Sequence, residues 1–225
     1  MLPLSAPAVR ARPLVTWGLL AANVLAYSSS AGAAQAWGFV PARFVAEPLA
    51  ALPTIFTSMF LHGGLLHLLG NLWFLYLFGG AVEAALGRAR FLAFYLSAGL
   101  VAALAQLVSD PSSAVPMIGA SGAIAGVLGG FALRYPRAPV AIITPLLFSI
   151  ELPAFVVVGG WFAIQVLLGI SSLGEQAGVA FFAHVGGLVA GVAMMALTPR
   201  ERPRAVYVLR GTLDDWTPPS RRAPR

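Results

Sequence analysis

The chain has 225 residues, of which 59% are hydrophobic and 10% charged, and its lack of cysteine excludes disulfides, a thiol nucleophile and a cysteine-ligated metal. Soluble domains carry about 25% charged residues, so this composition, with a mean hydropathy of +0.84, indicates an integral membrane protein. The net charge is +6 and all fourteen basic residues are arginines, but they gather at the ends of apolar segments and in the tail, as membrane topology and not nucleic-acid binding would require.

The chain begins with a short basic segment, residues 1–13, which we expect to be a cytoplasmic N-terminus. An apolar run follows this segment. The run extends from Leu14 to about Tyr27 and is long enough for a first membrane helix if it continues to Trp37. Small residues follow Tyr27, so the run also fits a cleaved signal peptide. Both interpretations stay open at this stage.

Further apolar segments follow, separated by proline-rich, polar or basic stretches. We expect membrane helices within residues 53–82, 91–108, 119–133, 154–170 and 179–197. With the first segment they predict an all-α, polytopic membrane protein with a six-transmembrane-helix bundle over residues 14–197. Residues 138–153 are apolar but contain three prolines, which favours an interfacial or partly re-entrant connector. The tail, residues 198–225, holds seven arginines, and we expect it to be cytoplasmic and disordered.

The arginines also predict the orientation of the bundle. With a cytoplasmic N-terminus, thirteen of the fourteen arginines fall on the inner side, and only Arg43 lies outside. The positive-inside rule therefore places both termini in the cytoplasm and requires an even number of spans, which six satisfies. We accordingly predict a multi-pass membrane protein, and we expect its membrane to be the cytoplasmic membrane of a bacterium.

Four polar residues lie at similar depth in the predicted bundle. The second, fourth and sixth spans all run from outside to inside, and these residues come near their starts: His67, Asn71, Ser121 and His184. They therefore share the outer part of the bilayer. An ionisable residue inside a membrane is a functional candidate, although a buried histidine often serves structure alone.

Ser121 and His184 are candidates for a nucleophile and its general base. A serine hydroxyl becomes a strong nucleophile when a neighbouring imidazole takes its proton. Small residues let membrane helices approach closely enough for such a contact. Two glycine strips occur at the right places: Gly122, Gly126 and Gly129 in the fourth span, and Gly187 and Gly191 in the sixth. No carboxylate lies at the same depth to orient His184, so the spacing predicts a dyad.

Acyl transfer also needs hydrogen-bond donors for the developing oxyanion. The side-chain amide of Asn71 suits this role, with the backbone N–H of Ser121 and the ring of His67 beside it. His67 and Asn71 are four residues apart and share a helix face. Spacing alone leaves Asn71 equally open to a role as an interhelical hydrogen bond. The histidines lack HExxH spacing, and we expect no metal and no cofactor.

Three motifs carry a resemblance to a known family. The run GASG at Gly119–Gly122, the run AHVGGLVAG at Ala183–Gly191 and the run HGGLLHLLGN at His62–Asn71 are similar to the GxSG, AHxxGxxxG and HxxxxHxxxN patterns of rhomboid intramembrane serine proteases. They occur on the fourth, sixth and second spans, in the family's arrangement, and the resemblance covers roughly residues 41–197.

The resemblance implies roles for individual residues. Ser121 would be the nucleophile and His184 the general base, while Asn71, His67 and the Ser121 amide would stabilise the oxyanion. The site would be shaped by four glycines: Gly119, Gly122, Gly187 and Gly191. Two features depart from well-known bacterial members: Ala125 stands where some relatives have a tyrosine stacked on the base, and the first loop lacks their Trp-Arg pair.

The function implied by the resemblance is hydrolysis of peptide bonds in or near transmembrane segments of other membrane proteins. Substrates would enter near the second and fifth spans, with a small residue at the cleaved bond. The expected partners are transmembrane protein substrates and the lipid bilayer, without nucleic acid, and the sequence leaves the oligomeric state open. The alternative is a non-catalytic rhomboid-like membrane binder or proton-linked transporter, in which the glycines serve packing and the histidines relay protons.

Overall fold

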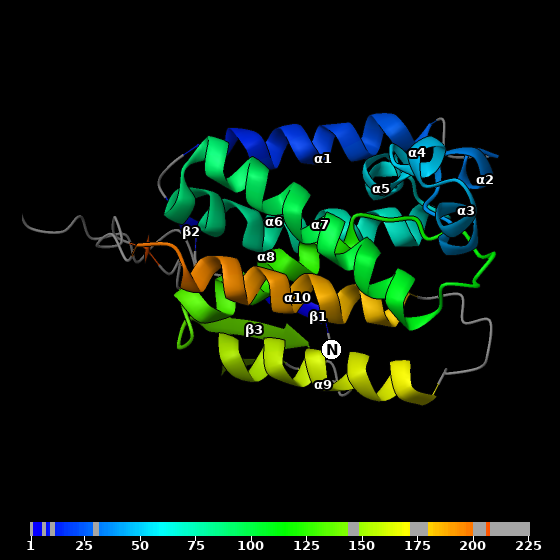
Figure 1. The fold of residues 1–225 in the computed structure, drawn as a ribbon. Helices are drawn as coiled ribbons and strands as arrows, with labels where there is room; N and C mark the ends of the chain where they lie inside the picture. The colour runs from blue at the N-terminus through cyan, green and yellow to red at the C-terminus, as the bar shows by residue number, and fades with distance from the viewer. Residues whose placement is uncertain are drawn as a thin grey trace, which may run out of the picture.

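The computed structural model describes residues 2–5, 8–9, 12–28, 32–143, 149–171, 180–199 and 206–207. The described chain is mostly helical, and its long helices run side by side (Figure 1). They are α1 (Leu14–Tyr27), α6 (Leu65–Leu86), α7 (Arg88–Ser109), α8 (Ser121–Arg134), α9 (Ala154–Ser171) and α10 (Phe181–Ala196). Short helices gather at one end of the bundle (Figure 1): α2 (Ala34–Trp37), α3 (Pro41–Ala46), α4 (Pro48–Ala51), α5 (Thr54–Thr57) and the 3-10 helix η1 (Ser58–Phe60).

Three of the described helices, α6, α7 and α9, are long and apolar enough to cross a membrane, and α1, α8 and α10 are apolar but shorter. The predicted boundaries of α7 to α10 agree with the structure to within a few residues. Two boundaries were wrong. The first helix ends at Tyr27 and does not continue to Trp37, and α6 begins at Leu65 instead of near residue 53. Gly64 precedes α6 in an extended conformation, which breaks the helix there.

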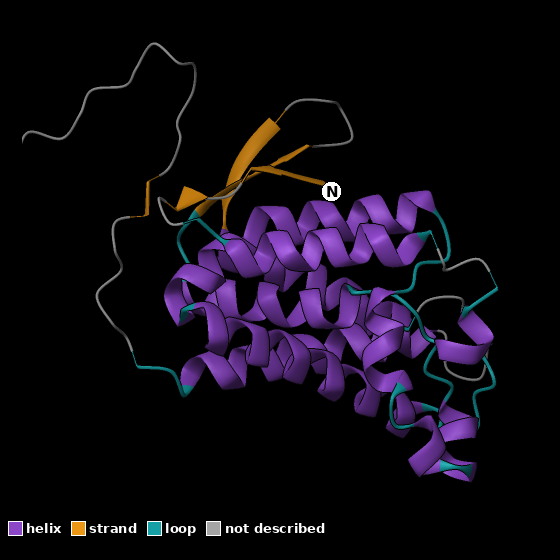
Figure 2. Ribbon diagram, turned by 90° about the horizontal axis from the view of Figure 1, so that it is seen from above, coloured by secondary structure: helices purple, strands orange, loops and turns teal. Residues whose placement is uncertain are grey.

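The expectation of an all-α fold needs correction, because strands also occur. The predicted connector forms a hairpin of β3 (Pro139–Ile143) and β4 (Ser149–Pro153), and β1 (Leu2–Ser5) pairs with the other edge of β3. A second pairing joins β2 (Ala8–Val9) to β5 (Val206–Tyr207). Figure 2 shows the strands beside the helices. Val140 and Ile142, two residues apart, are both buried, as a strand with one face on the core requires. Most of the predicted disordered tail lies outside the described residues.

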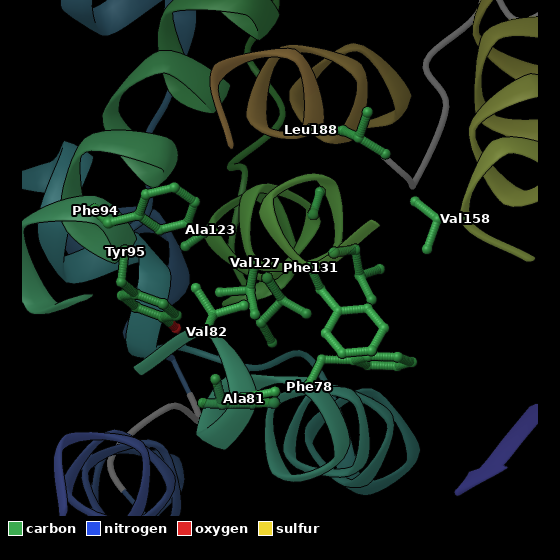
Figure 3. Close-up of a cluster of buried hydrophobic side chains, with 14 of the residues drawn as sticks. Phe78, Ala81, Val82, Phe94, Tyr95, Ala123, Val127, Phe131, Val158 and Leu188 are labelled. Atoms are coloured by element: carbon green, nitrogen blue, oxygen red, sulfur yellow. The ribbon is translucent and has the colours of Figure 1, made fainter. Parts of the chain in front are cut away.

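Helix α8 is the centre of the bundle. Every residue from Gly122 to Phe131 is buried, and α6, α7, α9 and α10 all contact this helix. In Figure 3, the side chain of Phe131 meets that of Phe78 from α6, and their rings contact edge to face at 5.0 Å. Aromatic pairs of this kind contribute about 0.5–1.5 kcal/mol beyond their burial. The start of α8, where Ser121 lies, is therefore held by close packing along the helix.

The buried carboxylate of Glu83 joins α6 to the start of α1. Its Oε1 accepts a hydrogen bond from the backbone N–H of Val15 at 3.1 Å, and its Oε2 accepts bonds from the N–H and hydroxyl of Thr16 at 2.7 and 2.8 Å. The first N–H groups of a helix have no partner within the helix, and a negative charge is favourable beside them. Glu83 thus caps α1 from another helix.

Candidate active site

Ser121 and His184 are in hydrogen-bond contact. Ser121 is the first residue of α8, and His184 lies in the first turn of α10. Nε2 of His184 is 2.8 Å from Oγ of Ser121, although 63 residues separate them in the chain. This is the distance at which an imidazole can take a proton from a hydroxyl.

Glycines set the close approach of α8 and α10. A Cβ added at Gly187 would collide with the carbonyl oxygen of Gly122, and a Cβ added at Gly191 would collide with the carbonyl oxygen of Gly126. The backbones of the two helices are therefore in direct contact, with no room for side chains between them. The glycine strips seen in the sequence are the surfaces where α8 and α10 meet.

Gly119, two residues before Ser121, lies against the side chains of His67 and Asn71. A Cβ at Gly119 would lie 2.7 Å from Nε2 of His67 and 3.6 Å from Nδ2 of Asn71. Its φ of +118° is a conformation that residues with a side chain rarely adopt. Its N–H donates to the carbonyl of Ser58 at 2.9 Å, which fixes the loop. Glycine is thus required here both by the backbone and by the neighbouring side chains.

Asn71 carries a buried donor. The side chain is 7% exposed, and among the described residues Nδ2 has no hydrogen-bond partner. A buried donor left without a partner costs about 1–3 kcal/mol. The alternative role for Asn71, an interhelical hydrogen bond from this nitrogen, therefore finds no acceptor in the described part of the chain. Its position beside Gly119 leaves the amide available to a group bound near Ser121.

Cavities adjoin Ser121 on two sides. The lateral cavity, of about 250 Å³, lies between α6, α8 and α9 and is lined by Leu66, His67, Gly70, Asn71, Phe74, Ser121, Ile124, Ala125, Leu128 and Trp161. The dyad cavity, of about 270 Å³, includes Ser121, His184, His67 and Gly119 in its lining. A third cavity, of about 220 Å³, shares His67 with both and includes Gln106 and Ser113, so we call it the polar cavity.

Two residues of α9 that sequence reasoning missed complete the surroundings of His184. Nδ1 of His184 is 2.7 Å from Oε1 of Gln165. The ring of Trp161 contacts the imidazole at a centroid distance of 5.6 Å, with the two planes tilted by 40°. Trp161 thus makes a ring contact with His184 of the kind that the resemblance attributes to a tyrosine at the position of Ala125. A signal for Gln165 was present: it is the one amide or charged side chain of α9.

His62 lies in the loop before α6, in contact with the ring of His67. It is buried, and the two rings meet edge to face at 5.1 Å. Burial, and then the electrostatic effect of His67, lower the pKa of His62 to about 4, so this ring is neutral at pH 7. In the part of the chain that the structure describes, no three His, Asp or Glu side chains lie together in a way that would hold a metal ion.

The comparisons with known proteins agree with these motifs. A family model of the Rhomboid domain matches residues 50–201, and the chain belongs to the rhomboid family. It is 32% identical over 140 residues to the presenilin-associated rhomboid-like protein, mitochondrial, of Homo sapiens, a match that covers 60% of this chain and 35% of that protein.

Bacterial relatives match over a shorter region. The putative rhomboid protease YdcA of Bacillus subtilis is 41% identical over 75 residues, covering 33% of this chain and 37% of that protein. Rhomboid protease GluP of the same organism is 44% identical over 75 residues, covering 33% of this chain and 14% of that protein. The chain thus spans only a minor part of the length of each of these relatives.

The predicted location in a bacterial cytoplasmic membrane is corrected by these findings. Relatives that match 60% or more of this chain are named as mitochondrial proteins of animals, among them proteins of Homo sapiens and Danio rerio. Arginine distribution gives the sidedness of a chain in its membrane, but it does not identify the membrane. What stands is association with a membrane.

Proposed function

We propose that this rhomboid-family chain is an intramembrane serine endopeptidase, which hydrolyses peptide bonds in or near transmembrane segments of other proteins through Ser121 and His184. The observation that carries the proposal is the 2.8 Å contact between Oγ of Ser121 and Nε2 of His184. The buried amide nitrogen of Asn71 nearby, without a partner in the described chain, adds the donor that acyl transfer needs. Two relatives that are named rhomboid proteases, one of them putatively, support the same reaction class.

The first half of the reaction forms an acyl-enzyme. Nε2 of His184 takes the hydroxyl proton while Oγ of Ser121 attacks the carbonyl carbon of the scissile bond. The carbonyl oxygen becomes an oxyanion, which accepts hydrogen bonds from the Ser121 backbone N–H and the Asn71 side chain, with His67 as a third donor. The N–H of Ser121 lies at the positive end of α8, where it lacks an intrahelical partner.

Collapse of this intermediate releases the first product. The protonated ring of His184 gives its proton to the leaving nitrogen as the C–N bond breaks, so that one product leaves as an amine. A water molecule then attacks the ester on Ser121, and His184 takes a proton from that water. Return of the proton to Oγ releases the carboxylic acid and restores the free enzyme.

A six-span arrangement would place this site below the membrane surface. The shorter apolar helices α1, α8 and α10 would join α6, α7 and α9 as spans. Helix α8 has 14 residues and is therefore about 21 Å long, less than a bilayer core of about 30 Å. If Arg134, at the C-terminal end of α8, lies at one surface of the bilayer core, then Ser121 lies within the core and does not reach its opposite surface. Water would then reach the dyad through the polar cavity, which includes Gln106 and Ser113 in its lining and shares His67 with the dyad cavity.

The lateral cavity is the proposed place for the substrate side chain next to the cleaved bond. Its lining includes the polar side chains of Ser121 and Asn71, and it also includes the apolar side chains of Phe74, Ile124 and Leu128. It lies between α6 and α9, the helices between which the family resemblance places substrate entry. Because Ala125 is small, a volume of about 250 Å³ remains there, which would accept apolar side chains larger than the small residue expected from the resemblance.

The test is cleavage of a model transmembrane substrate by the purified full chain in liposomes. Wild type is expected to cut the substrate, and Ser121→Ala and His184→Ala are expected to lose all detectable cleavage while keeping their helical circular dichroism and Tm. Ser171→Ala is the matched control, because Ser171 is exposed at the end of α9. Full cleavage by Ser121→Ala would overturn the proposal and favour a non-catalytic binder or transporter.

A further inference from the structure

We propose that Gln165 is a positioning residue that holds His184 in the tautomer able to accept the proton of Ser121. Its kinetic consequences rest on the proposed function, whereas the tautomer itself is a property of the folded protein. The inference concerns the ring nitrogen that faces away from Ser121.

The hydrogen-bond geometry selects one tautomer. Oε1 of Gln165 is an amide oxygen and only accepts hydrogen bonds, so Nδ1 of His184, at 2.7 Å, carries the proton. A neutral imidazole has a single N–H, which leaves Nε2 with a lone pair. This lone pair faces Oγ of Ser121 at 2.8 Å. In the other tautomer Nε2 carries the ring proton and presents an N–H to Ser121. This nitrogen then has no lone pair to accept the proton of Ser121.

The same bond becomes stronger as the reaction proceeds. When His184 takes the proton of Ser121 its ring becomes positive, and the bond from Nδ1 to Gln165 becomes charge-assisted. An interaction that is stronger in the transition state than in the ground state raises the rate of the chemical step. An amide does this without a negative charge in an apolar bundle, where an unpaired carboxylate would cost several kcal/mol more to bury.

The setting of Gln165 in α9 supports a role that the fold alone does not need. The side chain is 8% exposed and is the one amide or charged group in a helix of otherwise apolar and small residues. A buried amide in such a helix is unfavourable unless it is hydrogen-bonded, and its partner here is the candidate base. Trp161, four residues earlier, shares the face of α9 and packs on the same ring. One face of α9 therefore holds His184 by a hydrogen bond and by a ring contact.

The experiment compares Gln165→Leu, which removes the acceptor, with Gln165→Glu, which keeps one. Ile164→Ala is the matched control, because Ile164 is the adjacent residue of α9 and is 54% exposed. The chain has only three histidines, so 15N NMR of histidine-labelled protein reads the protonation of each ring nitrogen. Cleavage kinetics and their pH profile are measured on the same preparations. His67 of α6 interacts electrostatically with His184, and all of these variants retain it.

Three results are expected. In wild type and in Ile164→Ala, the neutral ring of His184 carries its proton on Nδ1, and this preference is lost in Gln165→Leu. The kcat of Gln165→Leu falls about tenfold and its KM is unchanged, because the variant loses one hydrogen bond that stabilises the transition state. Gln165→Glu keeps the Nδ1–H tautomer and recovers kcat. The acid limb of its pH profile moves to higher pH, because a carboxylate beside the ring favours the protonated imidazole.

Two results would overturn the inference. The first is an unchanged tautomer in Gln165→Leu. The second is an equal loss of kcat and Tm in the Leu and Glu variants without a shift in pH profile, as a merely structural role would give. Absence of Ser121-dependent cleavage in wild type would overturn the proposed function, and the tautomer measurement would still decide the inference.

Discussion

Gly187 packs directly against the carbonyl oxygen of Gly122, close to the candidate dyad. Gly122 follows Ser121 in α8, and Gly187 comes three residues after His184 in α10. Backbone contact at this point brings Oγ of Ser121 within 2.8 Å of Nε2 of His184. Helix packing and the chemistry of the site are thus two consequences of the same glycines.

Separating α8 from α10 by one methyl group should therefore lower both activity and stability. A Cβ at Gly191 would collide with the carbonyl oxygen of Gly126, so Gly191→Ala forces the helices apart. Overpacking of this kind costs about 1–3 kcal/mol. We expect a lower Tm and at least tenfold slower cleavage. Gly160→Ala is the control, because a Cβ there meets nothing within 4 Å, and equal behaviour of the two variants would contradict the packing argument.

Removing the amide of Asn71 should reduce turnover without loosening the fold. Nδ2 has no partner among the described residues, so Asn71→Ala is expected to keep Tm. Loss of one oxyanion donor typically costs about 10²–10³ in kcat. Thermal unfolding and cleavage kinetics are measured together. A variant with a lower Tm and near-normal kcat would instead assign Asn71 to interhelical structure.

Removing the carboxylate of Glu83 should act on stability. Glu83→Ala leaves the N–H groups of Val15 and Thr16 and the hydroxyl of Thr16 without their acceptor. Hydrogen bonds to charged groups contribute about 1.5–3 kcal/mol each, so losing three of them should lower the free energy of unfolding by at least about 4 kcal/mol. Glu83→Gln, which keeps an acceptor oxygen, should lose less. The exposed Glu151 serves as the control in Glu151→Ala, and an equal effect there would refute the capping role.

Filling the lateral cavity should change which side chain is accepted beside the cleaved bond. Ala125 is fully buried and lines the cavity next to Ser121, so Ala125→Phe reduces the space available. A poorly fitting group in such a pocket costs about 10–200-fold in kcat/KM. We expect cleavage at leucine to fall by at least about tenfold and cleavage at alanine to persist, which also verifies the fold. An unchanged ratio between the two substrates would place the side chain elsewhere.

Sequence alone predicted those parts of the molecule that depend on local pattern. Helices α7 to α10 follow from apolar runs that end at arginines, prolines or polar residues, and Ser121 and His184 stand out because polar groups inside such runs are rare. The hairpin of β3 and β4 was missed, because a short apolar segment with prolines does not reveal its strand partners. Gln165 stands out in the sequence as the one amide of α9. Its contact with His184 was missed because that contact depends on the rotation of α9 about its axis and on the distance to α10, which no local pattern contains.

The central claim, that His184 activates Ser121 as a nucleophile, is tested most directly by labelling the full chain in liposomes with a serine-reactive fluorophosphonate and locating the adduct by mass spectrometry. We predict one adduct, on Ser121, in wild type and in Ser171→Ala, and none in Ser121→Ala or His184→Ala although these variants keep their Tm. Labelling of Ser121 at an undiminished rate in His184→Ala would contradict the claim.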